Sequence, residues 1–246
     1  MPDVSSADGL HRGPRVRAIL HAASFTPAQK LLLLALNAWP LAHLLGSVAW
    51  AVLPAWPAGW RALAVGLWLL ALPPLLARFV VGRGLPAGPI PVPSRYFFRW
   101  WTTWQLQMLF NRLPWLEELM RLLPGFYSVW LRLWGARIGR LTLWSPGVRI
   151  SDRPLLRIGN DTVIGIDARL VGHFGGLDAD GRVTLTLGPV TVGDRTTVGG
   201  SALLGPGVLL ESDQATEALF LGTPFTHWRD GQRVPRPDPP IPSVKS

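Results

Sequence analysis

A six-residue repeat between Ile158 and Leu210 constrains the fold of this chain more than any other feature. An aliphatic residue opens each hexad, usually with glycine after it, and the openings stand at Ile158, Ile164, Leu170, Val192, Val198, Leu204 and Leu210. Neither an α-helix nor an alternating strand has this period. It is typical of a parallel β-helix, in which three flat faces of one hexad each form a coil. The repeat therefore predicts a column of inward-pointing aliphatic side chains.

The aliphatic–glycine pairs at one hexad phase resemble those of the hexapeptide-repeat acyltransferase family. The resemblance covers about Ile138 to Pro224, and Leu221-Gly-Thr-Pro224 resembles the Gly-x-Pro-Ala signature that closes the last coil in that family, with Phe225 in place of the alanine. It implies a left-handed β-helix, a handedness that the repeat alone does not give. Colanic-acid-type acetyltransferases and the C-terminal part of poly-lysine synthetases are the most similar members. By the same resemblance we expect a homotrimer.

Two long apolar segments precede the repeat. Residues 31–53 and 62–81 are each long enough to cross a bilayer and are joined by a short Pro, Trp and Gly turn. The chain is 48% hydrophobic, with mean hydropathy +0.25 and 13 Trp, which agrees with membrane contact. We therefore predict a two-helix transmembrane hairpin over 31–83, with Trp50, Trp56 and Trp60 at one interface.

The placement of cations predicts the orientation of this hairpin. Four cations precede the first span and four end or follow the second, whereas Arg61 alone lies at the turn; the eight are Arg12, Arg15, Arg17, Lys30, Arg78, Arg83, Arg95 and Arg99. By the positive-inside rule both ends of the hairpin are cytoplasmic. The β-helix is then expected on the cytoplasmic face of a bacterial-type inner membrane, where acyl-CoA is found. A pair of buried helices in a soluble protein is the alternative.

The other segments complete the predicted organisation. Residues 1–30 read as a basic cytoplasmic N-terminus, and 84–135 as a Pro-rich linker followed by amphipathic helices broken at Pro114 and Pro124. Such helices either lie in the headgroup layer or pack against the β-helix. The β-helix itself is expected over 136–229, and a disordered Pro-rich tail over 230–246. The predicted fold class is thus mainly β, with helices confined to the first half.

His173 is the candidate catalytic residue. It ends the hexad run at the point where the phase is lost until about Leu187, so a loop is expected to leave the coil there. Histidine accepts a proton near neutral pH. In the acyltransferases that the chain resembles, the catalytic histidine lies at this kind of position, so the resemblance implies that His173 is the general base. An exposed or structural histidine is the alternative.

Two carboxylates near His173 are candidates for supporting roles. The resemblance implies that Asp152 binds acceptor hydroxyls, because its spacing from the histidine is similar to that in sugar-modifying members. Asp152 could equally cap a turn beside Arg153. Asp167 shares the hexad phase of His173 on the preceding face, and could orient the imidazole only across a coil or subunit contact.

The resemblance also implies acetyl-CoA or another acyl-CoA as co-substrate, with no metal. A close backbone approach to its pantetheine arm is expected at Gly199, Gly200, Ser201 and Gly222, and phosphate contacts at Arg195, Arg229 and Arg233. These glycines could instead be coil corners. The segment 211–220 is shorter and less periodic than the family's final coil, and that coil normally helps to line the CoA groove.

The sequence thus predicts a membrane-anchored acyltransferase, an O- or N-acetyltransferase acting on a membrane-proximal acceptor such as a lipid-linked sugar or polysaccharide precursor. A non-enzymatic β-helix scaffold at the membrane is the alternative. A γ-type carbonic anhydrase needs three histidines around zinc, whereas the repeat region has His173 and His227. The absence of cysteine excludes disulfides and thiolate nucleophiles. Nucleic acid is not an expected partner, because the net charge of +9 is concentrated around the apolar segments.

Overall fold

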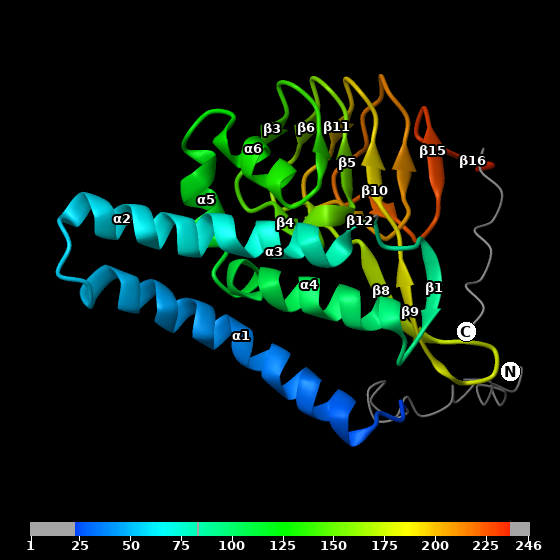
Figure 1. The fold of residues 1–246 in the computed structure, drawn as a ribbon. Helices are drawn as coiled ribbons and strands as arrows, with labels where there is room; N and C mark the ends of the chain where they lie inside the picture. The colour runs from blue at the N-terminus through cyan, green and yellow to red at the C-terminus, as the bar shows by residue number, and fades with distance from the viewer. Residues whose placement is uncertain (1–22, 83, 237–246) are drawn as a thin grey trace, which may run out of the picture.

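The computed structural model of this chain describes residues 23–82 and 84–236. A hairpin of long helices lies along one side of a β-helix, and further helices fill the space between them and cover one end of the coils (Figure 1). Most of the predicted basic N-terminus, Arg83 and the tail beyond 236 lie outside the described residues.

The hexad repeat forms a parallel β-helix, as predicted. Its strands fall into three faces: β2 (Arg137–Ile138), β5 (Leu156–Ile158), β10 (Val190–Val192), β13 (Leu209–Leu210) and β15 (His227–Arg229); β3 (Leu143–Trp144), β6 (Val163–Ile164) and β11 (Thr197–Val198); and β4 (Arg149–Ile150), β7 (Arg169–Leu170), β12 (Leu203–Leu204) and β14 (Leu221–Gly222). Within each face the neighbouring strands are parallel and in register. The left-handed sense of the coil stays a prediction.

The residues that open the hexads form the core. Ile158 pairs in register with Val192, and Val192 with Leu210. Ile164, Leu170, Val198 and Leu204 are all fully buried. Glycine follows these residues because the next coil passes very close: a Cβ on Gly165 would lie 2.5 Å from the Val198 carbonyl oxygen. The repeat thus sets both the apolar column and the spacing of the coils.

The last coil is reduced, as its weak periodicity predicts. In the described part of the chain β11 has no strand after it on its face, only an isolated bridge from Thr197 to Ala215. The predicted disordered tail begins too early, since Gln232–Val234 forms strand β16 antiparallel to β15. Side-chain and backbone pairing continue to Arg236, whose Nη1 donates to the Gly207 carbonyl at 2.7 Å.

The repeat is interrupted by a β-hairpin, where the sequence predicted a loop. β8 (His173–Leu177) and β9 (Val183–Leu187) leave the coil after β7 and pair with each other. β1 (Gly88–Pro91) adds to β9 on its other side. Part of the predicted Pro-rich linker, Gly88–Pro91, is therefore a strand of the sheet, and the prediction that these residues form an extended linker was wrong. Ile90, Leu185 and Leu187 form a small second core there.

The helices occupy the first half, as expected. α1 (Pro27–Val52) pairs with a second long helix made of α2 (Ala58–Gly66), a π-helical turn η2 (Leu67–Ala71) and α3 (Leu72–Val81). α4 (Arg95–Arg112), α5 (Trp115–Arg121) and α6 (Phe126–Leu133) follow, with breaks near Pro114 and Pro124. The two long helices are apolar and long enough to cross a membrane by length and composition.

α4 lies inside the molecule. Half of its residues are buried, including the polar Thr103, Gln105 and Gln107. It packs against α1 and α3 on one side and reaches the β-helix on the other, where Leu106 and Phe110 join the main core. α4 is therefore an internal layer that packs against the β-helix, and contact of the predicted amphipathic helices with the headgroup layer stays a prediction.

The stacked core predicts a large effect of truncation at an inward position. Leu204 is fully buried between β7 and β14, and Leu204→Ala is expected to lower the free energy of unfolding by about 2 to 5 kcal/mol. Leu143 on β3 points outward and is 59% exposed, so Leu143→Ala provides the control with a much smaller effect. Chemical denaturation measures both variants, and equal losses would contradict the inward stacking.

Candidate active site

The structure brings His173 and Asp152 together at the edge of the coil. His173 is the first residue of β8, and Asp152 follows β4 in the preceding coil. The imidazole Nδ1 lies 2.6 Å from Asp152 Oδ2. Since an ionised carboxylate only accepts hydrogen bonds, the neutral imidazole carries its proton on Nδ1. The lone pair of Nε2 is then available to a proton donor.

Asp152 is held by two further donors. The Gly172 amide donates to Oδ2 at 3.0 Å, and the indole Nε1 of Trp100 donates to Oδ1 at 2.9 Å. The residue is only 2% exposed. Carboxylates fixed in this way hold a histidine in one tautomer and one orientation. Asp152 thus lies behind the imidazole, where it faces no open space.

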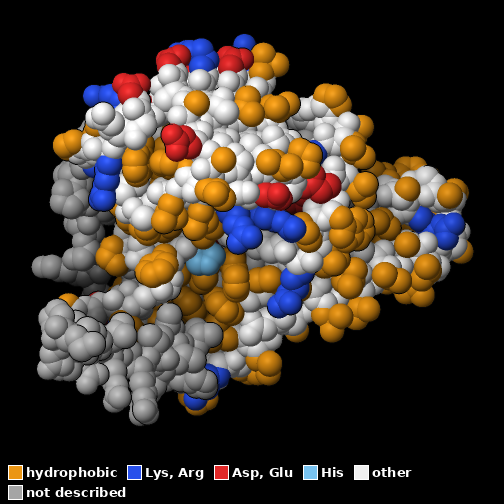
Figure 2. Space-filling view, turned by 180° about the vertical axis from the view of Figure 1, so that it is seen from behind, with side chains coloured by type: hydrophobic (Ala, Val, Ile, Leu, Met, Phe, Trp, Pro, Cys, Tyr) orange, Lys and Arg blue, Asp and Glu red, His pale blue; other side chains and the backbone are white. Residues whose placement is uncertain are grey.

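Two tryptophans of α4 form a wall beside the imidazole. The ring centroids of Trp100 and Trp104 lie 4.8 Å and 5.8 Å from that of His173. The side chain of His173 is 21% exposed, whereas His43 and His227 are buried. On the face drawn in Figure 2, a histidine lies in a hollow with hydrophobic side chains around it and cationic side chains beside it. The imidazole is thus reachable from outside but mostly shielded from water.

The surroundings of His173 shift its pKa in opposite directions. Burial lowers the pKa of His173, because the charged form loses hydration. The charge of Asp152 and its hydrogen bond raise the pKa, and together they outweigh burial, so the net shift is upward. A raised pKa makes the imidazole a stronger base than an isolated histidine.

A buried ion pair fixes the residue next to Asp152. Arg153 is 1% exposed, and its guanidinium is paired with Glu117 of α5. The Arg153 amide donates to Gln107 Oε1 at 2.7 Å, and Nη1 donates to Asn111 Oδ1 at 2.9 Å, both in α4. Asp152 thus binds the imidazole of His173, while the next residue, Arg153, binds side chains of α4 and α5.

The acceptor role predicted for Asp152 is not supported by its position. Its buried carboxylate already receives three hydrogen bonds, so little of it remains for an acceptor hydroxyl. Asp167 does not contact His173; its Oδ1 lies against Gly147 in the preceding coil. The carboxylate that orients the imidazole is thus Asp152, twenty-one residues upstream. Neither the partner nor the indole donor was predicted.

The predicted CoA-binding residues do not form one group. Gly199 and Gly222 serve the coil, since a Cβ on Gly199 would lie 2.1 Å from the Glu217 carbonyl oxygen and one on Gly222 would meet buried side chains of Leu204 and Val208. Gly200 and Ser201 bond to the adjacent coils at a corner, through Leu219 and Ile166.

The predicted phosphate-binding arginines are also engaged elsewhere. Arg195 is paired with Asp213 and Arg229 with Glu211, whose carboxylate also receives a hydrogen bond from His227. Arg233 lies in β16 at the end of the coils. These ion pairs reduce the positive charge that is free to meet a phosphate.

The sequence analysis did not single out a pair of arginines on β4 and β7, the strands that precede Asp152 and His173. Arg149 and Arg169 are exposed neighbours on β4 and β7, in register on adjacent strands. The ion pairs in the described part of the chain involve Arg121, Arg153, Arg182, Arg195 and Arg229, and thus neither of these two. Two like charges on adjacent strands repel each other unless an anion lies between them. A sequence signal exists, since each arginine precedes an inward residue at the same hexad phase.

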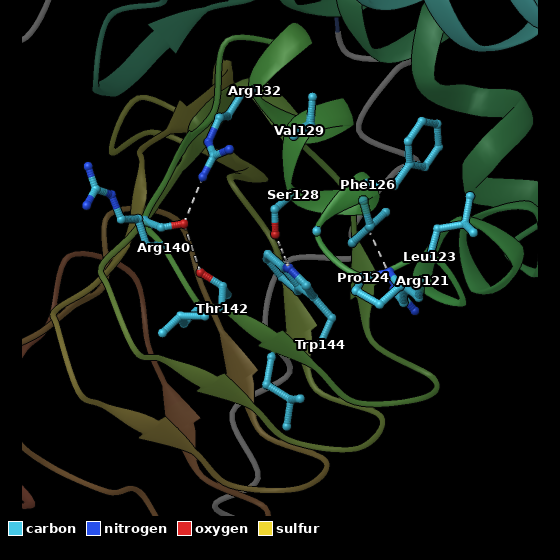
Figure 3. Close-up of a pocket in the computed structure, with 15 residues that line it drawn as sticks. Arg121, Leu123, Pro124, Phe126, Ser128, Val129, Arg132, Arg140, Thr142 and Trp144 are labelled. Carbon is cyan, nitrogen blue, oxygen red and sulfur yellow. Dashed lines mark hydrogen bonds between the residues drawn. The ribbon is translucent and has the colours of Figure 1, made fainter.

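Another pocket in the described part of the chain lies away from His173 and lacks such groups. It has a volume of about 810 Å³ and lies between α6 and the first coil (Figure 3). Trp144 Nε1 donates to Ser128 Oγ at 3.0 Å, and Arg132 donates to the Ile138 and Gly139 carbonyls. No histidine or carboxylate is among its lining residues. The candidate active site is therefore the His173–Asp152 pair.

Comparisons with known proteins give only distant likenesses. No protein-family model and no curated protein matches the chain. The chain is similar in structure to a maltose O-acetyltransferase from Clostridium difficile 630, with 16% identity, a TM-score of 0.36, and coverage of 50% of this chain and 82% of that one. It is also similar to a hexapeptide-repeat-containing acetyltransferase from Vibrio cholerae, with 14% identity, a TM-score of 0.32, and coverage of 57% and 93%.

A third likeness is to serine acetyltransferase isoform 3 from Entamoeba histolytica, determined in complex with cysteine. The identity is 14%, the TM-score 0.21, and the coverage 78% of this chain and 69% of that one. The assignment of the β-helix rests on the strand pairing within the chain itself.

The charge of Asp152 predicts the titration of His173. In Asp152→Asn the charge and the accepting oxygen are lost while burial remains, so the pKa of His173 is expected to fall below that of the unchanged protein. NMR titration of the imidazole measures this value. Asp167→Asn is the matched control, because that carboxylate does not contact His173. An equal or higher pKa in Asp152→Asn would show that the pair does not form.

Proposed function

We propose that this chain is an acyltransferase that moves an acyl group from acyl-CoA to a hydroxyl or amine. The observation that carries the proposal is a histidine with a buried carboxylate behind Nδ1 and an open Nε2, on the edge of a parallel β-helix. The hexad pattern resembles that of the hexapeptide-repeat acyltransferases, which adds acyl transfer as the reaction class. Acceptors with a hydroxyl or an amine remain equal candidates.

The imidazole acts as a general base in the proposed reaction. Nε2 takes the proton from the acceptor, and the acceptor oxygen or nitrogen forms a bond to the thioester carbonyl carbon. The carbon–sulfur bond then breaks, and the departing thiolate receives the proton from the imidazolium. Asp152 stabilises the imidazolium between these steps, because its negative charge lies 2.6 Å from Nδ1.

The exposed arginines Arg149 and Arg169, on the strands that precede Asp152 and His173, support binding of the donor. CoA carries phosphates, for which arginine is a suitable partner. We propose Arg149 and Arg169 for this contact in place of Arg195 and Arg229, since the latter two are already ion-paired. CoA that binds at Arg149 and Arg169 would not need contacts with the reduced final coil.

The general-base role predicts the kinetics of a His173 variant. His173→Gln is expected to lower kcat for transfer from labelled acetyl-CoA by about 10² to 10⁴, the usual contribution of a positioned base. Purified protein is assayed against lipid extracts and soluble sugars, and circular dichroism checks that the fold is retained. Full activity in this variant would contradict the role of His173 as the general base. If the unchanged protein shows no transfer, the result favours a non-enzymatic binding scaffold.

The apolar hairpin supports a location at the membrane, although its packing differs from a free-standing pair of spans. Contacts with α4 begin at Phe25, just before α1, and extend to His43; the helical part from Pro27 to His43 is about 24 Å long at the rise of an α-helix. Trp130 of α6 donates to the Leu70 carbonyl in the second helix. A hairpin that stood across the ~30 Å hydrocarbon core would draw α4 and its polar side chains into it.

We therefore propose that the hairpin lies along one face of the membrane. Its outward side is apolar over its whole length, with Leu34 68%, Leu45 57%, Val52 64% and Phe79 85% exposed. The turn carries Trp56 and Arg61, both suited to the interface. Both ends and the turn are then on the same side, which we take as the cytoplasmic side from the positions of the cations.

Self-association as a homotrimer remains part of the proposal. Exposed apolar side chains line one edge of the β-helix: Ile166 and Leu219 at stacked corners, and Leu203 and Leu221 on β12 and β14. Burial of such a strip between subunits removes apolar surface from water.

The membrane arrangement predicts which sites a membrane-impermeant maleimide reaches. The chain has no cysteine, so Ala55→Cys in the turn and Asp180→Cys between β8 and β9 can each be labelled alone. Both are expected to react only after the cytoplasmic face is opened. Reaction of Ala55→Cys in intact spheroplasts would instead show a hairpin that crosses the bilayer. The labelled protein should also resist alkaline extraction, and its release would contradict membrane insertion.

A further inference from the structure

A groove between α1 and α4 shares one wall residue, Trp104, with the surroundings of the candidate active site. It has a volume of about 590 Å³, within the range of small-molecule sites. α1 contributes Pro40, Leu41 and Leu44, and α4 contributes most of the other wall, including Trp101, Trp104 and Met108. Trp104 also contacts the imidazole of His173, with ring centroids 5.8 Å apart. Trp104 therefore lines the groove and also packs against His173 of the His173–Asp152 pair.

Two leucines of the groove also lie on the exposed apolar side of the hairpin. Leu41 is 61% and Leu44 40% exposed, and both line the groove. This surface is the one that the proposed arrangement places against lipid. A chain that leaves the bilayer beside α1 can thus lie between the two helices without crossing water.

The groove also contains polar features that a purely structural cleft does not need. Arg112, the last residue of α4, lines it and takes part in none of the ion pairs of the described residues. A cation beside an apolar wall is complementary to a molecule with an apolar chain and an anionic oxygen group.

We propose that the groove holds the apolar chain of the acceptor, which is therefore an anionic amphiphile drawn from the membrane. This inference rests on the proposed function of His173. The chain lies between α1 and α4, the phosphate or carboxylate pairs with Arg112, and the hydroxyl or amine reaches Nε2 of His173 beside Trp104. A free sugar would leave the groove empty.

A photoreactive dodecyl phosphate with a diazirine at the chain end tests the occupant. It is added to the full-length protein in nanodiscs, and labelled peptides are mapped by mass spectrometry. Label is expected within 37–44 and 101–113. Leu44→Trp fills the groove and should reduce this label about tenfold, whereas Leu45→Trp, on an exposed position outside the groove, should not. Label spread evenly over the hairpin, or equal in both variants, would overturn the proposal.

Two further comparisons separate the parts of the ligand. Affinity for alkyl phosphates below their micelle concentration should rise up to about fourfold per added CH₂ from octyl to dodecyl, and this rise should vanish in Leu44→Trp. Arg112→Gln should weaken dodecyl phosphate but not neutral dodecyl glucoside, with Arg99→Gln on the same helix as control. A flat chain-length series, or equal effects of both arginine variants, would contradict the assignment.

The outcomes also distinguish this inference from the proposed function. His173→Gln should be photolabelled like the unchanged protein, because the base is not part of the groove. If the unchanged protein is labelled in the groove but has no transfer activity, the groove binds the chain of an amphiphile and the proposed acyltransferase function is wrong. If palmitoyl-CoA displaces the label while a single-chain acceptor does not, the groove holds the donor's chain, and the inference fails while acyl transfer stands.

Discussion

The attachment of α4 to the turn at Asp152 and Arg153 is the constraint on which the candidate site depends. Trp100 donates to the carboxylate of Asp152, and seven residues later Gln107 accepts from the Arg153 amide. This spacing puts both contacts on one face of the helix. Removal of one partner from a buried ion pair such as Arg153–Glu117 costs about 3 to 5 kcal/mol, so the turn is held firmly. Asp152 can therefore keep its position behind the imidazole.

This attachment also explains why the helices and the β-helix form one unit. α4 is covered by the hairpin on the side away from the coils, where Gln105 donates to Asn37 Oδ1 at 2.8 Å. The same helix thus joins the apolar hairpin, the groove and the dyad. If the hairpin lies on a membrane, α4 sets the distance between the bilayer and His173. The proposed chemistry at the membrane surface follows from this layering.

The sequence predicted the features that depend on nearby residues. The hexad openings, the break after His173, the apolar helices and the reduced last coil are all local patterns. Contacts between distant residues were not accessible: Trp100 and Asp152 are separated by 52 residues, and nothing in the local pattern distinguishes Trp100 from its neighbours Trp101 and Trp104. The partners of Asp152 and the burial of α4 were not predicted for this reason, because both depend on packing between distant segments.

The tautomer of His173 tests the account most directly. Above its pKa, with the ring nitrogens labelled, the ¹⁵N chemical shifts should show a proton on Nδ1 and a free lone pair on Nε2, because Asp152 accepts from Nδ1. A proton on Nε2 in the neutral ring, or a pKa that is not raised above that of an ordinary histidine, would contradict both the orienting role of Asp152 and the general base proposed from it.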